Sequence, residues 1–233
     1  TRDGSRALTA ANDGRLTVWN AGMVEPLFDL EVPGENRRAR QRGIDFSPDG
    51  TLAVTGGLDQ TLRIWNAITG EPIGEPMPHR RAIDCAVFSP DGKIVASAGR
   101  DTSVRFWSVE TQKEIAGPLQ HPMPAGWVAF TPDGRGILTG CWDQKVRLWD
   151  ARSYEPIGWP LNLDGVVHCI SFSRDGRFFA TSTSKGTVQI WDAKTLAPVG
   201  GEYQHAGDAM QVCFSPDGAR LAVATCFDSI RVW

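Results

Sequence analysis

Short runs of apolar residues alternate with turn-forming residues along the whole chain. The run "CAVFS" is followed by Pro90-Asp91-Gly92 and then by the run "KIVASAG". An Asp-Gly pair between two apolar runs is typical of a hairpin turn, because glycine adopts a positive φ without steric cost. The run "SVRFW" follows after a tight turn around Asp101. The pattern therefore predicts antiparallel strands.

A fourth run completes each group of strands. In "EIAGPLQ" it carries Pro118, and Pro76 and Pro160 stand at the corresponding places in the neighbouring groups. Proline cannot donate a hydrogen bond to a sheet, so this fourth strand is expected at an outer edge, where it also hinders edge-to-edge aggregation. Four antiparallel strands per group, the last of them with proline, are typical of a propeller blade.

Two independent markers share one period of 42 residues, with a single step of 46. The first marker is a tryptophan, found at Trp19, Trp65, Trp107, Trp149, Trp191 and Trp233. The second is an Asp-Gly pair, found at 3–4, 49–50, 91–92, 133–134, 175–176 and 217–218. Periods of this length indicate solenoids, propellers or arrays. We expect one all-β domain over 1–233 with about six repeats that close at the six tryptophans, the first and last incomplete, as in a fragment of a six- or seven-bladed ring.

With these markers the chain resembles the WD40-repeat β-propeller family over essentially its whole length, and its near-identical repeats resemble the tandem arrays of bacterial WD40 proteins. Trp149-Asp150 and Trp191-Asp192 match the dipeptide that closes the family's repeat. His79, His121 and His205 each stand 28 residues before a tryptophan, where the family has its histidine. The resemblance implies a non-catalytic protein-interaction scaffold with no cofactor.

The resemblance also implies a hydrogen-bonded tetrad of His, Ser or Thr, Asp and Trp inside each blade. Two tetrads are complete in the sequence: His79, Ser97, Asp101 and Trp107, and His121, Thr139, Asp143 and Trp149. The fifth repeat has Leu163 and Lys185 in place of His and Asp, and the sixth has Val223 and Phe227 in place of Ser/Thr and Asp. We expect these two blades to lose the network and to be the softer ones.

In the family, the loops between blades and the turn that holds the tetrad Asp lie on one face, where partners dock. Carried onto this chain, the implied partner-binding residues are Arg40, Arg42, Leu58, Arg80, Arg81, Asp84, Arg100, Trp142, His168, Asp208 and Met210. Trp142 occupies a turn where other repeats have Asn12, Leu58, Arg100, Ser184 and Cys226. It is interpreted as an interface anchor, with a Trp folded onto its own blade as the alternative.

Seven arginines form an arginine sector if the second and third blades are neighbours: Arg37, Arg38, Arg40, Arg42, Arg80, Arg81 and Arg100. A solvated loop is the plain interpretation; an acidic peptide, a phosphorylated segment or a nucleic-acid backbone are the alternatives. The net charge of −3 gives no chain-wide reason to expect nucleic acid. Aromatic residues are too sparse near the arginines to favour it.

Composition adds limits on location. No apolar run approaches the roughly 18 to 20 residues that a bilayer crossing needs. The five cysteines contain no CxxC pair, so reduced thiols in the cytoplasm are expected, although a missing N-terminal segment would change this expectation. A further domain of the same polypeptide is an alternative partner.

Two rival functions remain open. A propeller enzyme, or a binder of a small ligand or metal, would need convergent side chains in the central channel, for which only His168, Asp84 and Asp208 qualify. An architectural ring that mediates oligomerisation is the other. Trp127 is expected to fill space between blades or in the channel. Trp159, on a proline-bearing strand, is either an exposed contact or a clasp on the next blade.

Overall fold

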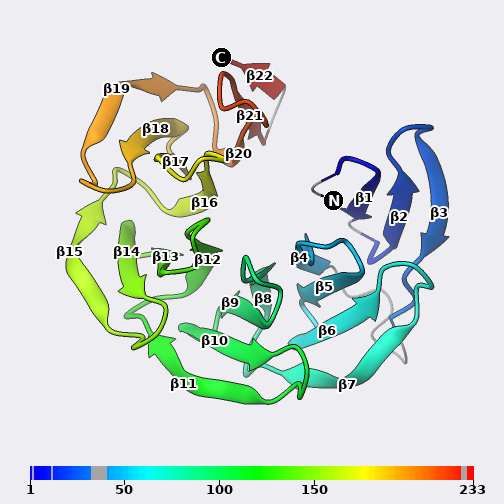
Figure 1. Ribbon diagram of the computed structural model, residues 1–233. Helices are drawn as coiled ribbons and strands as arrows, with labels where there is room; N and C mark the ends of the chain where they lie inside the picture. The colour runs from blue at the N-terminus through cyan, green and yellow to red at the C-terminus, as the bar shows by residue number, and fades with distance from the viewer. Residues whose placement is uncertain (2, 12, 33–40, 227–229) are drawn as a thin grey trace. The chain divides into compact units, whose positions relative to one another are not determined.

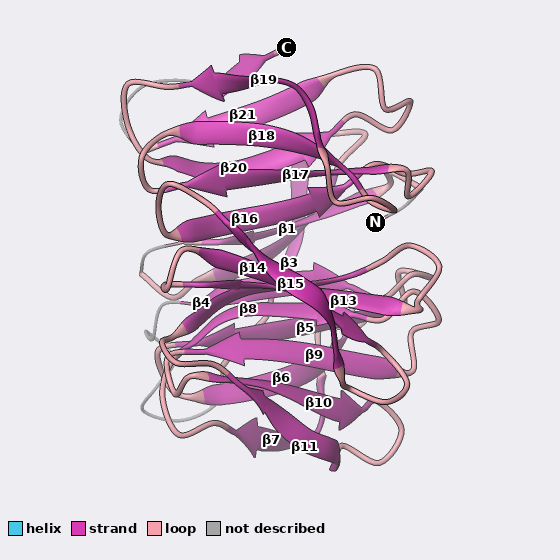
Figure 2. Ribbon diagram, turned by 90° about the vertical axis from the view of Figure 1, so that its left-hand side faces the viewer, coloured by secondary structure: helices cyan, strands magenta, loops and turns pink. Residues whose placement is uncertain are grey.

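A computed structural model describes residues 1, 3–11, 13–32, 41–226 and 230–233 of the chain. Within these residues it contains twenty-two β-strands and no helix. Figure 2 shows the strands joined by loops and turns. The strands form six antiparallel sheets, in each of which neighbours in sequence are neighbours in space. This confirms the predicted fold class, an all-β propeller with blades of up to four strands. No helix that is long and apolar enough to cross a membrane occurs in the described part.

The chain divides into two compact units, Thr1–Gln120 and His121–Trp233. The N-terminal unit holds blades 1 to 3 (Figure 1). Blade 1 contains β1 (Arg6–Ala10), β2 (Leu16–Asn20) and β3 (Glu25–Asp29). Blade 2 contains β4 (Gln41–Phe46), β5 (Leu52–Gly57), β6 (Thr61–Asn66) and β7 (Pro72–Pro78). Blade 3 contains β8 (Ile83–Phe88), β9 (Ile94–Gly99), β10 (Ser103–Ser108) and β11 (Glu114–Gln120).

The C-terminal unit holds blades 4 to 6. Blade 4 contains β12 (Ala125–Phe130), β13 (Gly136–Cys141), β14 (Lys145–Asp150) and β15 (Pro156–Asn162). Blade 5 contains β16 (Val167–Phe172), β17 (Phe178–Thr183), β18 (Thr187–Asp192) and β19 (Pro198–Gln204). Blade 6 contains β20 (Ala209–Phe214), β21 (Leu221–Thr225) and β22 (Ile230–Val232). The expectation that the whole chain is one domain stays a prediction.

The prolines lie on edge strands, as predicted. Pro76, Pro118 and Pro160 belong to β7, β11 and β15, and each of these strands is the last in its sheet. The Asp-Gly turns also match the prediction. Gly92 has a φ of 73°, and the carboxylate of Asp91 accepts hydrogen bonds from Ser89 Oγ at 2.6 Å and Lys93 N at 3.1 Å. These carboxylates therefore shape turns.

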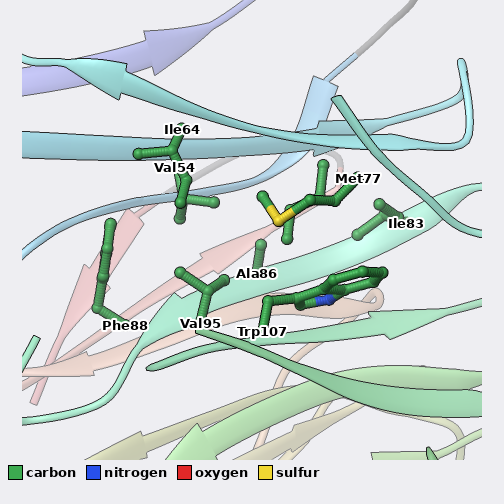
Figure 3. Packing of buried hydrophobic residues seen from close by; sticks show 9 residues of the cluster. Val54, Ile64, Met77, Ile83, Ala86, Phe88, Val95 and Trp107 are labelled. Atoms are coloured by element: carbon green, nitrogen blue, oxygen red, sulfur yellow. The ribbon is translucent and has the colours of Figure 1, made fainter. Parts of the chain in front are cut away.

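Consecutive blades of a unit pack face to face, so their middle strands are buried on both sides. The cluster between blades 2 and 3 includes Val54, Ile64, Ile83, Val95 and Trp107 (Figure 3). Within the N-terminal unit β4 lies beside β8, which confirms that the second and third blades are neighbours. The first strands of blades 2 and 3 therefore bring residues of two different repeats into contact.

The gap between neighbouring blades is set by one position of the first strand. At Gly43 on β4, a Cβ atom would stand 2.5 Å from the backbone nitrogen of Ala86 on β8. Trp127 holds the same repeat position in blade 4, and its indole nitrogen donates to the carbonyl oxygen of Ile170 on β16 at 2.9 Å. Trp127 therefore fills space between blades 4 and 5, one of the two places predicted for it.

Candidate functional site

One end of each sheet carries both the turn between the second and third strands and the connection from the preceding blade. We call it the connection end. The two segments are hydrogen-bonded: the amide of Arg100 donates to the carbonyl of Ala82 at 2.9 Å, and that of Trp142 to Pro124 at 3.0 Å. Side chains from a turn and from the adjacent first strand therefore meet at this end of each blade.

At the connection end of blades 2 and 3, Asp84 binds two arginines. Its carboxylate accepts from Arg100 Nε at 2.9 Å and from Arg100 Nη2 at 3.3 Å. Arg42 Nη1, from β4, donates to the same carboxylate at 3.0 Å. The Asp84 side chain is 9% exposed, whereas those of Arg42 and Arg100 are 36% and 34% exposed. A largely buried acid thus orients two half-exposed guanidinium groups from neighbouring blades.

Arg80 and Arg81 lie in the connection to β8 and are exposed. The amide of Arg80 donates to Asp101 Oδ2 at 3.1 Å, which fixes the backbone there. Leu58, in the turn between β5 and β6, is also exposed. The remaining predicted residues of this sector lie outside the described residues: Arg37, Arg38 and Arg40.

In blade 4 the residues equivalent to the Asp84–Arg100 pair are Gly126 and Trp142. A Cβ atom at Gly126 would stand 3.2 Å from Trp142 Nε1, so the indole lies over this glycine. Trp142 remains 37% exposed, and Met123 in the neighbouring connection is exposed too. The indole thus rests on its own blade while presenting part of its surface to solvent. Its role as an interface anchor stays a prediction.

His168 and Asp208 come from blades 5 and 6, and the structure brings them together. His168 Nε2 lies 3.6 Å from Asp208 Oδ2. Met210, on β20, is exposed. Across the residues that the structure describes, no group of three His, Cys, Asp or Glu side chains is arranged to hold a metal ion. The pair by itself provides two ligands, fewer than a zinc site uses.

The first tetrad is assembled in blade 3. His79 Nδ1 donates to Asp101 Oδ2 at 3.2 Å, so His79 Nε2 can accept from Ser97 Oγ at 2.7 Å. Ser97 Oγ in turn accepts from Trp107 Nε1 at 2.8 Å. Burial opposes ionisation of Asp101, but hydrogen bonds from His79 and Ser103 outweigh it and hold the pKa of this carboxyl well below its usual range.

The second tetrad is only half assembled, which corrects the expectation from the sequence. Trp149 Nε1 donates to Thr139 Oγ1 at 2.9 Å, but neither ring nitrogen of the buried His121 has a hydrogen-bond partner among the described residues. Asp143 instead binds Arg147 through two hydrogen bonds, at 2.5 and 3.1 Å. Burial, followed by the charge of Arg147, lowers the pKa of His121 to about 4.

The competing arginine explains why the two blades differ. Blade 3 has Arg105 at the position of Arg147, but Glu114 on β11 binds Arg105 at 3.0 Å and holds it 3.8 Å from Asp101. The residue equivalent to Glu114 in blade 4 is Pro156, which offers no acid. Arg147 therefore turns to the tetrad aspartate, and His121 loses its partner.

Blade 5 contains a network that the sequence analysis missed. Asp164 accepts from Thr183 Oγ1 at 3.0 Å and from Thr187 Oγ1 at 2.5 Å, and Gln204 Nε2 donates to Thr187 Oγ1 at 2.7 Å. Asp164 directly follows Leu163, the residue that replaces the histidine. An acid one position after a missing histidine was the available signal. In blade 6, Phe227 lies outside the described residues.

Comparison with known proteins gives one family. A family model described as "WD domain, G-beta repeat" matches residues 37–66, 70–108, 121–150 and 162–192, together more than half of the chain. Each match ends one residue after a repeat tryptophan: Trp65, Trp107, Trp149 and Trp191. No curated protein matches the chain.

Proposed function

Because the chain belongs to the WD40 family, we propose that it acts without catalysis as a docking platform that binds a protein or peptide partner at the connection end of its blades. WD40 propellers are typically protein-interaction scaffolds, but a fold alone does not assign a function. The proposal therefore depends on the side chains at that end. The partner is a separate protein or another domain of the same polypeptide.

We propose an acidic or phosphorylated segment as the partner of the arginine sector. The observation that carries this is the contact of Asp84 with both Arg42 and Arg100. One carboxylate between two guanidinium groups leaves a net positive charge, and exposed Arg80 and Arg81 add to it. Arginines that are already oriented lose little side-chain entropy when they bind a carboxylate or phosphate.

We propose Trp142 as an apolar anchor for the partner. A half-exposed indole held over a glycine presents a rigid surface, and tryptophan is among the residues that contribute most to protein interfaces. Met123 beside it extends the apolar area. Substitution Trp142→Ala should weaken partner binding without removing any contact of the arginine sector.

The test is fluorescence anisotropy with labelled decapeptides that contain glutamates, phosphothreonine or lysines in one common frame. We expect the acidic and phosphorylated peptides to bind, and Arg100→Glu to lower their affinity at least tenfold. Lys93→Glu is the matched control, since it makes the same charge change in blade 3 at the turn opposite to the connection end. If Arg100→Glu leaves the peptide affinity unchanged, or Lys93→Glu lowers it equally, the arginine sector is not the binding site.

We also propose a reducing compartment such as the cytoplasm. All five cysteines lie in the described part of the chain, and no two of them form a disulfide there. Burial raises the pKa of the Cys169 thiol to about 12, which makes it a poor nucleophile. Non-reducing and reducing electrophoresis of the chain purified from its native host would test for intermolecular disulfides at the exposed Cys213 and Cys226.

A further inference from the structure

Two edge strands have the same bulge and nearly the same sequence. Residues 71–76 read EPIGEP and residues 155–160 read EPIGWP. Gly74 on β7 has a φ of 67° and Gly158 on β15 a φ of 68°. The register is also equivalent, because Ile73 pairs with Ile64 and Ile157 pairs with Leu148, each beside a register shift. The outward-facing backbone groups of the two strands therefore correspond.

On β7 this bulge is covered by a side chain of the next blade. Gln112, in the turn between β10 and β11, donates through Nε2 to the carbonyl oxygen of Ile73 at 2.7 Å. Its Oε1 accepts from the amide of Glu75 at 3.2 Å. The carboxamide lies so close that a Cβ atom at Gly74 would overlap it. Gln112 thus binds one acceptor and one donor of an edge strand through a single side chain.

On β15 the corresponding bulge has no such cover. The equivalent of Gln112 is Leu196, which has a similar positive φ (58°, against 54° for Gln112) but packs into the apolar cluster around Trp191. The leucine side chain has no hydrogen-bonding group. Apart from Gly158 and its two chain neighbours, no atom of the described residues lies within 4 Å of a Cβ placed at Gly158. By the matched register, the carbonyl of Ile157 and the amide of Trp159 hold the positions of the two backbone groups that Gln112 binds on β7.

Trp159 distinguishes this bulge from the others. It stands where β7 has Glu75, and its side chain is 90% exposed. Ile157 beside it is exposed as well. On β19 no described side chain lies over Gly200 either, but the carbonyl of Val199 accepts from Gln189 Nε2 at 3.3 Å, and Gly201 offers no apolar surface. Of the three described bulges of this type, only that of β15 combines a glycine that no described side chain covers with a large aromatic side chain.

We propose that Ile157, Gly158 and Trp159 form a second docking site, for a partner polypeptide that inserts a glutamine side chain over Gly158. The carboxamide donates to the Ile157 carbonyl and accepts from the Trp159 amide, as Gln112 does on β7. An apolar side chain next to this glutamine covers the indole of Trp159. The site lies on an edge strand and shares no residue with the connection end, so it does not depend on the proposed platform function.

The test uses an array of synthetic nonapeptides with a central Leu-X pair, in which X is Gln, Glu or Leu, probed with the purified chain. We expect the chain to be retained on the Gln peptides. Trp159→Glu, which introduces the residue that β7 has at this position, should reduce this retention at least tenfold. Leu196→Gln should reduce retention equally, because it supplies an internal carboxamide to Gly158. Thermal unfolding of both variants verifies that the fold is kept.

The matched control is the twin bulge on β7. Glu75→Trp alone should add no binding, since Gln112 already covers Gly74, whereas Glu75→Trp combined with Gln112→Leu should create a second site. Equal retention on Leu and Gln peptides, a gain with Glu75→Trp alone, or no retained peptide would each overturn the proposal. None of these outcomes depends on Arg100, so the platform function is tested separately.

Discussion

Arg100 and Asp84 face each other as a two-point ion pair, with Nε to Oδ2 at 2.9 Å and Nη2 to Oδ1 at 3.3 Å. The pair joins the turn after β9 to the first strand of the same blade, and Arg42 extends it to the next blade. The acid is the least exposed of the three side chains. Orientation of the arginines therefore depends on Asp84.

Asp84→Ala should lower the free energy of unfolding by about 1–2 kcal/mol, because it leaves two arginines facing each other without the carboxylate; the value is reduced for their partial exposure. Urea denaturation measures it. Asp208→Ala is the control, since the Asp208 side chain is more exposed and its carboxylate lies 3.6 Å from His168 Nε2. Similar losses for both variants, or a loss unchanged in 1 M salt, would contradict an ion-pair role.

Ser97→Ala should cost about 2–3 kcal/mol, because it leaves the buried indole N–H of Trp107 and the Nε2 of His79 without partners. The control is Ser182→Ala on β17. Ser182 is equally buried, but its hydroxyl has no partner among the described residues. This substitution should be neutral or slightly stabilising. Thermal unfolding of the two variants side by side decides the comparison.

Gly43→Ala should destabilise the chain by about 2–3 kcal/mol, because the new methyl group meets the backbone of β8 and forces blades 2 and 3 apart. Gly117→Ala on β11 is the matched control. No atom of the described residues lies within 4 Å of a Cβ there. We expect its unfolding midpoint in urea to stay within error or to rise slightly. Equal midpoints for the two variants would show that the blades adjust freely.

The repeat itself was predictable because two markers, the tryptophan and the Asp-Gly turn, report the same period independently. Position within a blade follows directly from that period, as the edge prolines Pro76, Pro118 and Pro160 illustrate. Which hydrogen-bond partner a side chain binds does not follow from the period. His121 has the correct position but loses Asp143 to Arg147, and only the acid on the neighbouring strand, Glu114 in blade 3, decides that competition.

Contacts between blades were the least predictable from sequence. Gly43 and Trp127 share one repeat position, yet one allows close backbone approach and the other spans a gap with its indole. A single sequence contains no measure of that gap. The hydrogen bonds of Gln112 to β7 could not be predicted from the sequence for the same reason, because they depend on how closely the next blade packs.

His121 makes stability depend on pH in a defined window. Its pKa is about 4 in the folded chain, below the ordinary value of 6.5, because burial and Arg147 disfavour the charged ring more than Asp143 favours it. Between pH 6.5 and 4 the unfolded chain therefore binds a proton at His121 that the folded chain does not bind. The free energy of unfolding falls over this window as the pH is lowered toward 4, by at most about 3 kcal/mol.

Urea unfolding at pH 7, 6, 5 and 4 should show a smaller loss of unfolding free energy for His121→Phe than for the unaltered chain. His205, whose pKa burial also lowers, is present in both proteins and cancels in the difference. Parallel pH profiles would mean that His121 is protonated equally in the folded and unfolded chains.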